Sequence, residues 1–143
     1  MEKARIEVAS PRGFCNGVRQ ALEIVEKTIA RCGTPLYIFH EIVHNDFIVN
    51  DLKKRGIVFV DDLSAVPRGS TVIFSAHGVS KKIEEEAESL GLNTVDATCP
   101  LVKKIHEKAV EFSEKGFFIF LIGHKSHAET EGTFGRITGP AAI

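Results

Sequence analysis

The stretch Thr94-Val95-Asp96-Ala97-Thr98-Cys99-Pro100-Leu101-Val102 predicts a strand that runs into a cysteine, then a proline and a helix. Proline is favoured at the first position of a helix, where its missing N–H costs nothing. This order would leave Cys99 at the N-terminus of the helix, where the helix dipole favours the thiolate. Since the thiolate binds metal ions and attacks electrophiles, the stretch indicates a ligating or reactive cysteine.

Strand and helix patterns alternate on both sides of this stretch. Strands are predicted at residues 5–9, 36–39, 57–60, 71–74, 94–96 and 117–122. The last is a continuous apolar run, typical of a strand covered on both faces. Helices are predicted between Val18 and Gly33, after the caps Asn45 and Ser80, and between Leu101 and Gly116. Such alternation predicts an α/β fold with a parallel sheet and right-handed crossovers.

A boundary is expected near the start of the predicted Leu101 helix. It divides the chain into a first α/β unit over residues 1–97 and the start of a second unit over residues 98–143. The second segment offers one helix, one strand and a glycine-punctuated tail, which cannot bury the faces of so apolar a strand. We therefore expect the first unit to be complete and the second to be truncated.

The composition, net charge and cysteine count limit the kinds of protein that this chain can be. The chain has 143 residues, 43% of them apolar, which is enough for a buried core. A net charge of −1 does not indicate the excess of basic residues that binds nucleic acid or an anionic membrane, and neither is expected as a partner. The N-terminus lacks the apolar core of a signal peptide, and three cysteines are too few for a disulfide scaffold. A cytoplasmic location is expected.

Thiol, imidazole and carboxyl groups follow five successive predicted strands. In open α/β sheets, ligands bind outside the carboxyl ends of the strands. The side chains found after those ends are, in chain order, Cys15, His44, His77, Cys99, and His127 with Glu129. Each one alone could be a buried turn cysteine, a capping histidine or a solvated acid, but their convergence predicts one composite site.

The spacing of these groups does not select a metal. The sequence has no C-x-x-C motif and no histidine pair in an H-E-x-x-H context. Two thiolates with imidazoles would suit zinc or copper, whereas thiolates with a third from elsewhere would suit an iron–sulfur cluster. Cys32 lies on the apolar stripe of its helix and is expected in the core, because a free cysteine behaves there as a small hydrophobe. His40 and His106 are expected to be structural.

Five motifs together resemble one known family. They are Pro11-Arg12-Gly13-Phe14-Cys15-Asn16-Gly17-Val18, His40-Glu41-Ile42-Val43-His44-Asn45, Phe74-Ser75-Ala76-His77-Gly78-Val79-Ser80, Asp96-Ala97-Thr98-Cys99-Pro100-Leu101-Val102, and Gly123-His124 with His127, Glu129 and Gly132-Thr133. In this order they resemble the 4-hydroxy-3-methylbut-2-enyl diphosphate reductases, the IspH/LytB family. The resemblance extends over nearly the whole chain but matches only the N-terminal part of a full-length member.

The resemblance implies a reaction, a fold and a cofactor. Family members remove the allylic hydroxyl of their substrate with two electrons and two protons, at the last step of the non-mevalonate isoprenoid pathway. The products are isopentenyl and dimethylallyl diphosphates. The family fold is a trefoil of three α/β units around a central [4Fe–4S] cluster, which three cysteines hold. A diphosphate substrate and an electron donor such as ferredoxin or flavodoxin are the implied partners.

The resemblance also implies a role for each residue at the strand ends. Cys15 and Cys99 match the first two cluster ligands, and the third cysteine has no counterpart in this sequence. Cys32 is not expected to replace it. The residues matching the diphosphate-binding histidines are His44, His77 and His127, and the residue matching the proton-supplying acid is Glu129. We therefore expect an N-terminal fragment of the reductase that is inactive by itself.

Two other interpretations stay open on the residues alone. A stand-alone module could bind metal or diphosphate with the same thiols and histidines but without redox chemistry; one zinc and no inorganic sulfide would favour it. A thiol enzyme could instead use Cys99 as its nucleophile. Loss of iodoacetamide labelling at neutral pH in Cys99→Ser, but not in Cys15→Ser, would favour that second interpretation.

Overall fold

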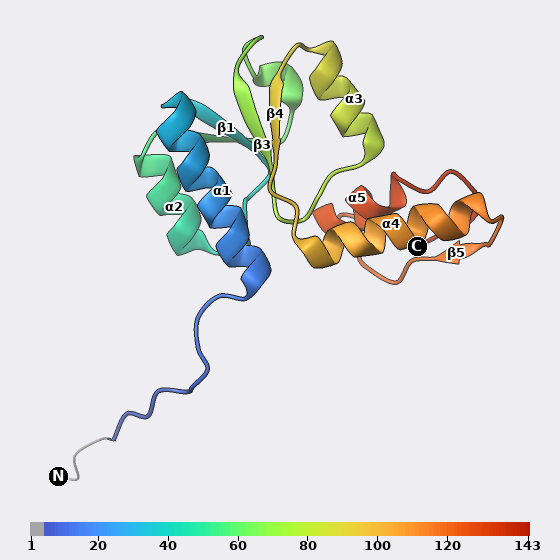
Figure 1. The fold of residues 1–143 in the computed structure, drawn as a ribbon, viewed down its shortest axis with the longest axis horizontal. Helices are drawn as coiled ribbons and strands as arrows, with labels where there is room; N and C mark the ends of the chain where they lie inside the picture. Colours follow the sequence, from blue (N-terminus) through green and yellow to red (C-terminus); the bar gives the residue numbers. More distant parts are fainter. Residues whose placement is uncertain (1–4) are drawn as a thin grey trace.

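The computed structural model describes residues 5–143 and has the α/β fold that the alternation predicts. Its helices are α1 (Asn16–Cys32), α2 (Asp46–Lys54), α3 (Lys81–Ser89), α4 (Pro100–Glu114) and α5 (Ala128–Phe134). Its strands are β1 (Leu36–Phe39), β2 (Ile57–Val60), β3 (Thr71–Phe74), β4 (Asn93–Asp96), β5 (Ile119–Phe120) and β6 (Ala141–Ala142), with a 3-10 turn η1 (Leu63–Ala65). Figure 1 shows that α4, α5 and β5 lie beside the body formed by the earlier elements.

The first four strands form one parallel sheet in the order β2-β1-β3-β4. The central strands are short and rich in branched apolar residues, and Ile38 and Ile73 face each other in register with no exposed surface. This is the pattern of a parallel sheet covered on both faces. Because all four strands run the same way, the residues that follow them meet at one edge of the sheet.

Two apolar clusters cover the two faces of this sheet. One joins the sheet to α1 and α2 through residues such as Val25 and Leu52. The other joins it to α3 and η1 through residues such as Ala87 and Leu63. All buried members of both clusters come from residues before 98. The packed core of the molecule therefore lies in the first segment, as the composition and strand pattern indicate.

The helix boundaries follow the caps predicted from the sequence. The side chain of Asn45 accepts a hydrogen bond from the Ile48 N–H at the start of α2. The side chain of Ser80 caps α3 in the same way. α1 ends at Gly33, which has a φ of +73°, a backbone conformation that glycine adopts without strain. Pro100 begins α4 and leaves Cys99 as its N-cap residue, which confirms the expectation for the opening stretch.

The predicted strand at residues 5–9 does not form. This segment runs away from the rest of the molecule (Figure 1), and the side chains of Ile6 and Val8 are 88% and 67% exposed. Its apolar residues alternate as in a half-buried strand. Among the described residues, however, no strand pairs with this segment, so its alternating apolar residues have no neighbouring strand beside them.

The apolar run at residues 117–122 also departs from the prediction. Only Ile119–Phe120 form a strand, paired in parallel with β6, and the side chains of Phe120 and Ile122 are 77% and 98% exposed. The strand is therefore not covered on both faces, because few elements pack against this small two-stranded sheet. The residues after Glu129, expected to be an irregular tail, instead contain most of α5 as well as β6.

Cys32 is exposed rather than buried in the core. α1 has 17 residues, or about 25 Å, whereas each strand of the first sheet has four, or about 13 Å. The last turn of α1 therefore extends past the sheet, and hydrogen bonds from Arg31 and Thr71 lower the pKa of the Cys32 thiol. Within residues 5–143, no helix is both long and apolar enough to cross a lipid bilayer.

Candidate functional site

Cys15 and Cys99 occupy equivalent positions at the starts of two helices. Cys15 is the N-cap residue of α1 and Cys99 that of α4, and neither side chain makes a capping hydrogen bond. Both cysteines line one cavity of about 680 Å³, together with the first residues of the two helices. Both thiols therefore lie at helix N-termini, beside the same cavity.

Gly17 allows the two helix starts to approach each other. A Cβ atom at residue 17 would lie 2.4 Å from the Sγ atom of Cys99, a distance that atoms in real structures do not reach. The first turn of α1 therefore packs directly against the Cys99 side chain, and any larger residue would push the two apart. The sequence shows Gly17 beside Cys15 but gives no sign that it contacts a residue 82 positions later.

Three histidine rings lie close to one another in the folded chain, near the cysteines. The ring centroids of His44 and His77 are 4.4 Å apart, those of His44 and His127 are 5.2 Å apart, and those of His77 and His127 are 5.8 Å apart. They come from the loop before α2, the loop after β3 and the N-cap of α5. We call these three residues the histidine cluster. The structure thus brings together the three histidines that the strand-end pattern singles out.

Hydrogen bonds fix the ring nitrogens of the cluster. The Nδ1 atom of His127 accepts the backbone N–H of Glu129 at 3.3 Å, so its Nε2 atom carries the proton in the neutral ring. That Nε2 lies 3.3 Å from the Nε2 atom of His44, to which it donates. The Nδ1 atom of His44 then carries its proton toward the Glu41 carboxylate, 3.5 Å away. The network is consistent with one tautomer for His127 and one for His44.

His77 is the most enclosed member of the cluster. Its Nδ1 atom lies 3.2 Å from the Oγ atom of Ser75, a buried residue that sequence reasoning did not single out. Burial, and to a smaller extent the neighbouring rings of His44 and His127, together lower the pKa of His77 to about 4. At neutral pH this ring is uncharged and can donate or accept hydrogen bonds. An anion beside it would raise its pKa.

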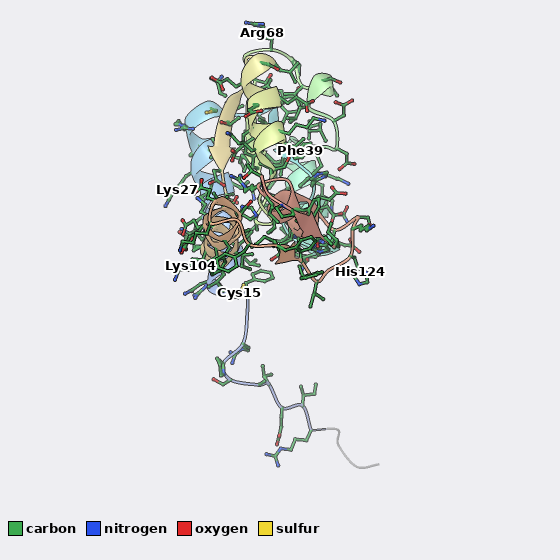
Figure 2. All side chains as sticks on the ribbon, turned by 90° about the vertical axis from the view of Figure 1, so that its right-hand side faces the viewer. Cys15, Lys27, Phe39, Arg68, Lys104 and His124 are labelled. Atoms are coloured by element: carbon green, nitrogen blue, oxygen red, sulfur yellow. The ribbon has the colours of Figure 1, made fainter. Side chains whose placement is uncertain are left out.

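Backbone contacts join the cysteines to the histidine cluster. The N–H of Cys99 donates to the carbonyl oxygen of Ala76, the residue before His77, at 2.9 Å. Glu129 lies in the first turn of α5, two residues after His127, and is half-buried. His124, the other histidine of that loop, is exposed and projects from the edge of the molecule (Figure 2). The predicted site residues therefore occupy one continuous edge of the structure.

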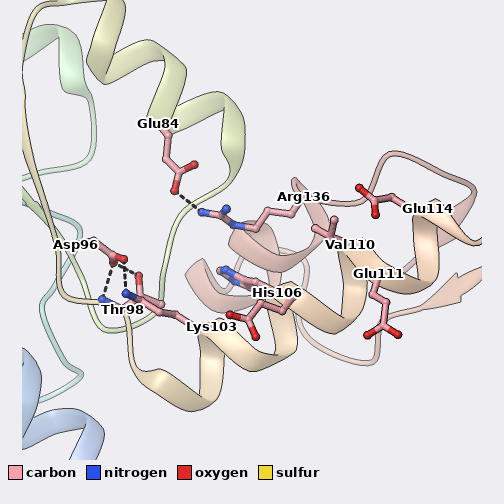
Figure 3. Close-up of a pocket in the computed structure, with 10 residues that line it drawn as sticks. Glu84, Asp96, Thr98, Lys103, His106, Val110, Glu111, Glu114 and Arg136 are labelled. Atoms are coloured by element: carbon pink, nitrogen blue, oxygen red, sulfur yellow. Dashed lines mark hydrogen bonds and ion pairs between the residues drawn. The ribbon is translucent and has the colours of Figure 1, made fainter.

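A separate cavity of about 440 Å³ lies where α3, α4 and α5 meet (Figure 3). Its lining includes Asp96, Lys103, His106 and Arg136 but none of the cysteines or the histidine cluster. An ion pair joins Lys103 to Asp96 at 2.6 Å. His106, expected to be structural, is 6% exposed, and burial lowers its pKa to about 4. This cavity marks the junction between the two segments of the chain.

Metal-ligating groups are sparse in the described part of the chain. Residues 5–143 contain no group of three or more His, Cys, Asp or Glu side chains placed to hold a metal ion. The cysteine pair fits two thiolate positions, since both cysteines line one cavity at helix N-termini and Gly17 lets the start of α1 approach Cys99. Cys32 lies at the opposite end of α1 from Cys15 and does not join them.

Comparison with known proteins gives consistent matches. The profile of the LytB protein family matches residues 6–143. The chain is 55% identical over 134 residues to 4-hydroxy-3-methylbut-2-enyl diphosphate reductase 2 of Burkholderia mallei, covering 94% of this chain and 41% of that protein. A solved structure of the E-1-hydroxy-2-methyl-but-2-enyl-4-diphosphate reductase from Plasmodium falciparum superposes with a TM-score of 0.90 at 42% identity, covering 94% of this chain and 42% of that one.

A second solved structure agrees with the first. It is described as (E)-4-hydroxy-3-methyl-but-2-enyl diphosphate reductase, the terminal enzyme of the non-mevalonate pathway. It matches with a TM-score of 0.81 at 35% identity, covering 95% of this chain and 49% of that one. The chain therefore spans less than half the length of these relatives and reproduces the fold of that part.

Proposed function

This chain belongs to the LytB protein family, and from that membership we propose that it is the N-terminal part of a 4-hydroxy-3-methylbut-2-enyl diphosphate reductase. The proposed reaction is reductive removal of the allylic hydroxyl, which yields isopentenyl and dimethylallyl diphosphates. The observation that carries the proposal is the histidine cluster, whose three rings come from segments up to 83 residues apart yet have centroids only 4.4 to 5.8 Å apart. Such a cluster has no evident role in the apolar core.

The proposed role of the histidine cluster is to bind the diphosphate. Neutral imidazoles donate hydrogen bonds, and they gain charge when an anion raises their pKa. The pKa of His77 is about 4 without an anion, so this ring is uncharged at neutral pH and a bound anion would raise its pKa. A bound diphosphate would therefore draw protons onto the cluster as it binds. This explains how a chain with a net charge of −1 could bind a highly charged anion.

The proposed role of Cys15 and Cys99 is to hold two of the three liganded irons of a [4Fe–4S] cluster. When bound, such a cluster would pass on, one at a time, the two electrons of the external donor and would offer a Lewis-acidic iron to the hydroxyl oxygen. The helix N-termini of α1 and α4 would stabilise the two thiolates, and Gly17 would let the start of α1 lie directly against Cys99. Ferredoxin or flavodoxin is the proposed class of electron donor.

Glu129 is the proposed source of protons. Hydroxide is a poor leaving group, so cleavage of the C–O bond requires an acid within reach of the departing oxygen. Glu129 follows His127 in the first turn of α5 and is held there by its backbone N–H bond to the His127 ring. The same helix start thus carries one proposed diphosphate ligand and the proposed acid.

We also propose that these 143 residues are inactive by themselves. The proposed cluster requires three thiolates, and the sequence has three cysteines of which Cys32 lies at the far end of α1. Two thiolates leave an additional iron without a protein ligand. The reaction would then require the third ligand from residues outside this sequence.

Titration with inorganic pyrophosphate tests the proposed anion site without the iron cluster. We expect saturable binding that His44→Ala, His77→Ala and His127→Ala each weaken by about tenfold, which corresponds to one lost charge-assisted hydrogen bond. His124→Ala is the matched control, because this histidine lies on the same loop as His127 but is exposed, and binding should be unchanged. Equal weakening by His124→Ala, or no binding by the parent chain, would contradict the proposed site.

Metal analysis of the purified chain tests the same proposal against the module without redox chemistry. One zinc per chain with no inorganic sulfide would favour that module and count against the reductase. Iron accompanied by sulfide, lost in Cys99→Ser, would favour the reductase.

A further inference from the structure

The loop that carries His77 is enclosed between two helices of the second segment. This loop, residues 75–80, joins β3 to α3. On one side it meets α4, where a Cβ atom at Gly78 would lie 2.6 Å from the Cε1 atom of His106. On the other side it meets α5, where a Cβ atom at Gly132 would lie 3.1 Å from the carbonyl oxygen of Gly78. The backbone of the loop is therefore in direct contact with both helices.

One side chain ties the end of α5 to this loop. Arg136 follows α5, and its Nε atom donates to the carbonyl oxygen of Val79 at 2.9 Å. A terminal nitrogen of the same guanidinium donates to the carboxylate of Glu84 in the first turn of α3 at 2.5 Å (Figure 3). The Arg136 side chain is 22% exposed, so solvent competes little for these bonds. A planar guanidinium suits this double role, because its donors are fixed relative to one another.

These contacts bear directly on the geometry of the histidine cluster. His127 is the N-cap of α5, and Arg136 lies just beyond the other end of that helix. α5 has seven residues and is about 10 Å long, so it acts as a short rigid rod. Anchoring one end of the rod to Val79, two residues after His77, fixes the distance between the His127 and His77 rings. His44 and His77, in contrast, are both held by the first segment.

We propose that Arg136 is a positioning residue for the anion site, which sets His127 on α5 against His77 by binding Val79 and Glu84 at once. The inference rests on the proposed function, in which the histidine cluster binds a diphosphate. Arg136 itself does not touch the cluster, and it acts only through the placement of α5. Loss of the guanidinium frees α5 to shift while the first sheet stays folded.

The test is an NMR comparison of the free chain and its variants, read through contacts between histidine ring protons. In the parent chain, nuclear Overhauser effects are expected within both the His44–His77 and the His77–His127 pairs. Arg136→Ala is expected to weaken the His77–His127 effect at least severalfold and to leave the His44–His77 effect unchanged. Arg136→Lys is expected to restore the effect in part, since an ammonium can reach one acceptor but lacks the fixed second donor.

Pyrophosphate titration of the same variants gives the second readout. Arg136→Ala is expected to raise the dissociation constant about tenfold. Arg55→Ala is the matched control, because Arg55 pairs with Glu26 at 2.7 Å within the first segment, away from the cluster. That variant is expected to leave the dissociation constant unchanged.

The possible outcomes separate the two proposals. If the parent chain does not bind pyrophosphate but Arg136→Ala still loses the His77–His127 effect, the proposed anion site is wrong and the positioning role stands. If Arg136→Ala keeps that effect, or changes affinity no more than Arg55→Ala, the positioning role is wrong. If Arg136→Ala does not fold, Glu84→Gln removes the ion pair alone, and an unchanged His77–His127 effect there would overturn the inference.

Discussion

The two segments of this chain differ sharply in how they are stabilised. In the first, up to residue 97, a four-stranded parallel sheet is covered on both faces, and side chains such as Leu36 and Ile73 have no exposed surface. In the second, from residue 98, two strands of two residues each lie beside α4 and α5, and the side chains of Phe118 and Phe120 are 52% and 77% exposed. The first segment has a hydrophobic core of its own, whereas the stability of the second depends on its contacts with the first.

The difference explains where the proposed site lies. His44 and His77 follow strands β1 and β3 of the well-packed sheet, and Cys15 begins α1, which packs on that sheet. Cys99 and His127 begin helices that reach this edge through specific contacts, such as the Cys99 N–H bond to Ala76. The proposed site is therefore assembled at the junction of a stable segment and a dependent one. The predictions below test this asymmetry.

The largest expected effect is on the core of the first segment. Ile38→Ala removes a side chain with no exposed surface and should lower the free energy of unfolding by about 3 kcal/mol. Phe120→Ala in the second segment should lower it by less than about 0.5 kcal/mol, because that ring is mostly exposed. Urea unfolding followed by far-UV circular dichroism measures both. Similar losses in the two variants would mean that the second segment has a core of its own.

A smaller effect is expected from glycine replacements at the junction. Gly78 has a φ of +75° and lies against His106, so Gly78→Ala adds a steric clash to backbone strain. We expect a loss of about 2–3 kcal/mol. Gly116→Ala is the matched control, with a φ of +80° but no atom within 4 Å of the new Cβ, and should cost only about 1 kcal/mol. Equal costs would show that the close approach at Gly78 is not real.

The smallest of the three expected effects is the change in stability with pH. The pKa of His106 is about 4 in the folded chain, below its ordinary value of 6.5, because burial and the nearby Arg136 disfavour the charged ring. As the pH falls below 6.5 the unfolded chain takes up this proton first, so stability is present above that pH and is lost toward pH 4. We expect the free energy of unfolding to fall by about 2 kcal/mol for this residue between pH 7 and pH 5.

His106→Gln supplies the comparison for the pH dependence. His77 has a pKa lowered in the same direction, so it contributes a slope of the same sign that the variant retains. The variant should therefore show a shallower loss of stability than the parent chain, measured by urea unfolding at pH 7, 6 and 5. An unchanged slope would place His106 in contact with solvent and would weaken the account of the junction.

Much of the first segment could be predicted because its signals are local. Asn45 and Ser80 mark helix starts through bonds made within one turn, and the strands at 36–39, 57–60 and 71–74 are short apolar runs between such signals. His44, His77 and Cys99 also followed from local order, since they come after β1, β3 and β4 at one edge of the parallel sheet. Among the described residues, Cys15 follows no strand and His127 follows β5 of the separate two-stranded sheet, so the topology of the first sheet does not by itself bring them to this edge.

The failures of prediction share a physical cause, which is dependence on distant partners. The alternation at residues 5–9 and the apolar run at 117–122 both indicate strands, but a strand forms only where another edge or layer covers it. Cys32 follows the apolar stripe of α1, yet the length of the helix relative to the sheet exposes it. The roles of Gly17 and Arg136 depend on residues more than 50 positions away, which no local pattern reports.

Anaerobic reconstitution with iron and sulfide tests the central claim most directly. If the chain supplies only Cys15 and Cys99 as cluster ligands, we expect less than a full complement of iron, a product that loses iron on desalting, and no turnover of 4-hydroxy-3-methylbut-2-enyl diphosphate. Cys32→Ser should leave the iron content unchanged, whereas Cys99→Ser should lower it. A stable brown protein with about four irons per chain and reductase turnover would contradict the account.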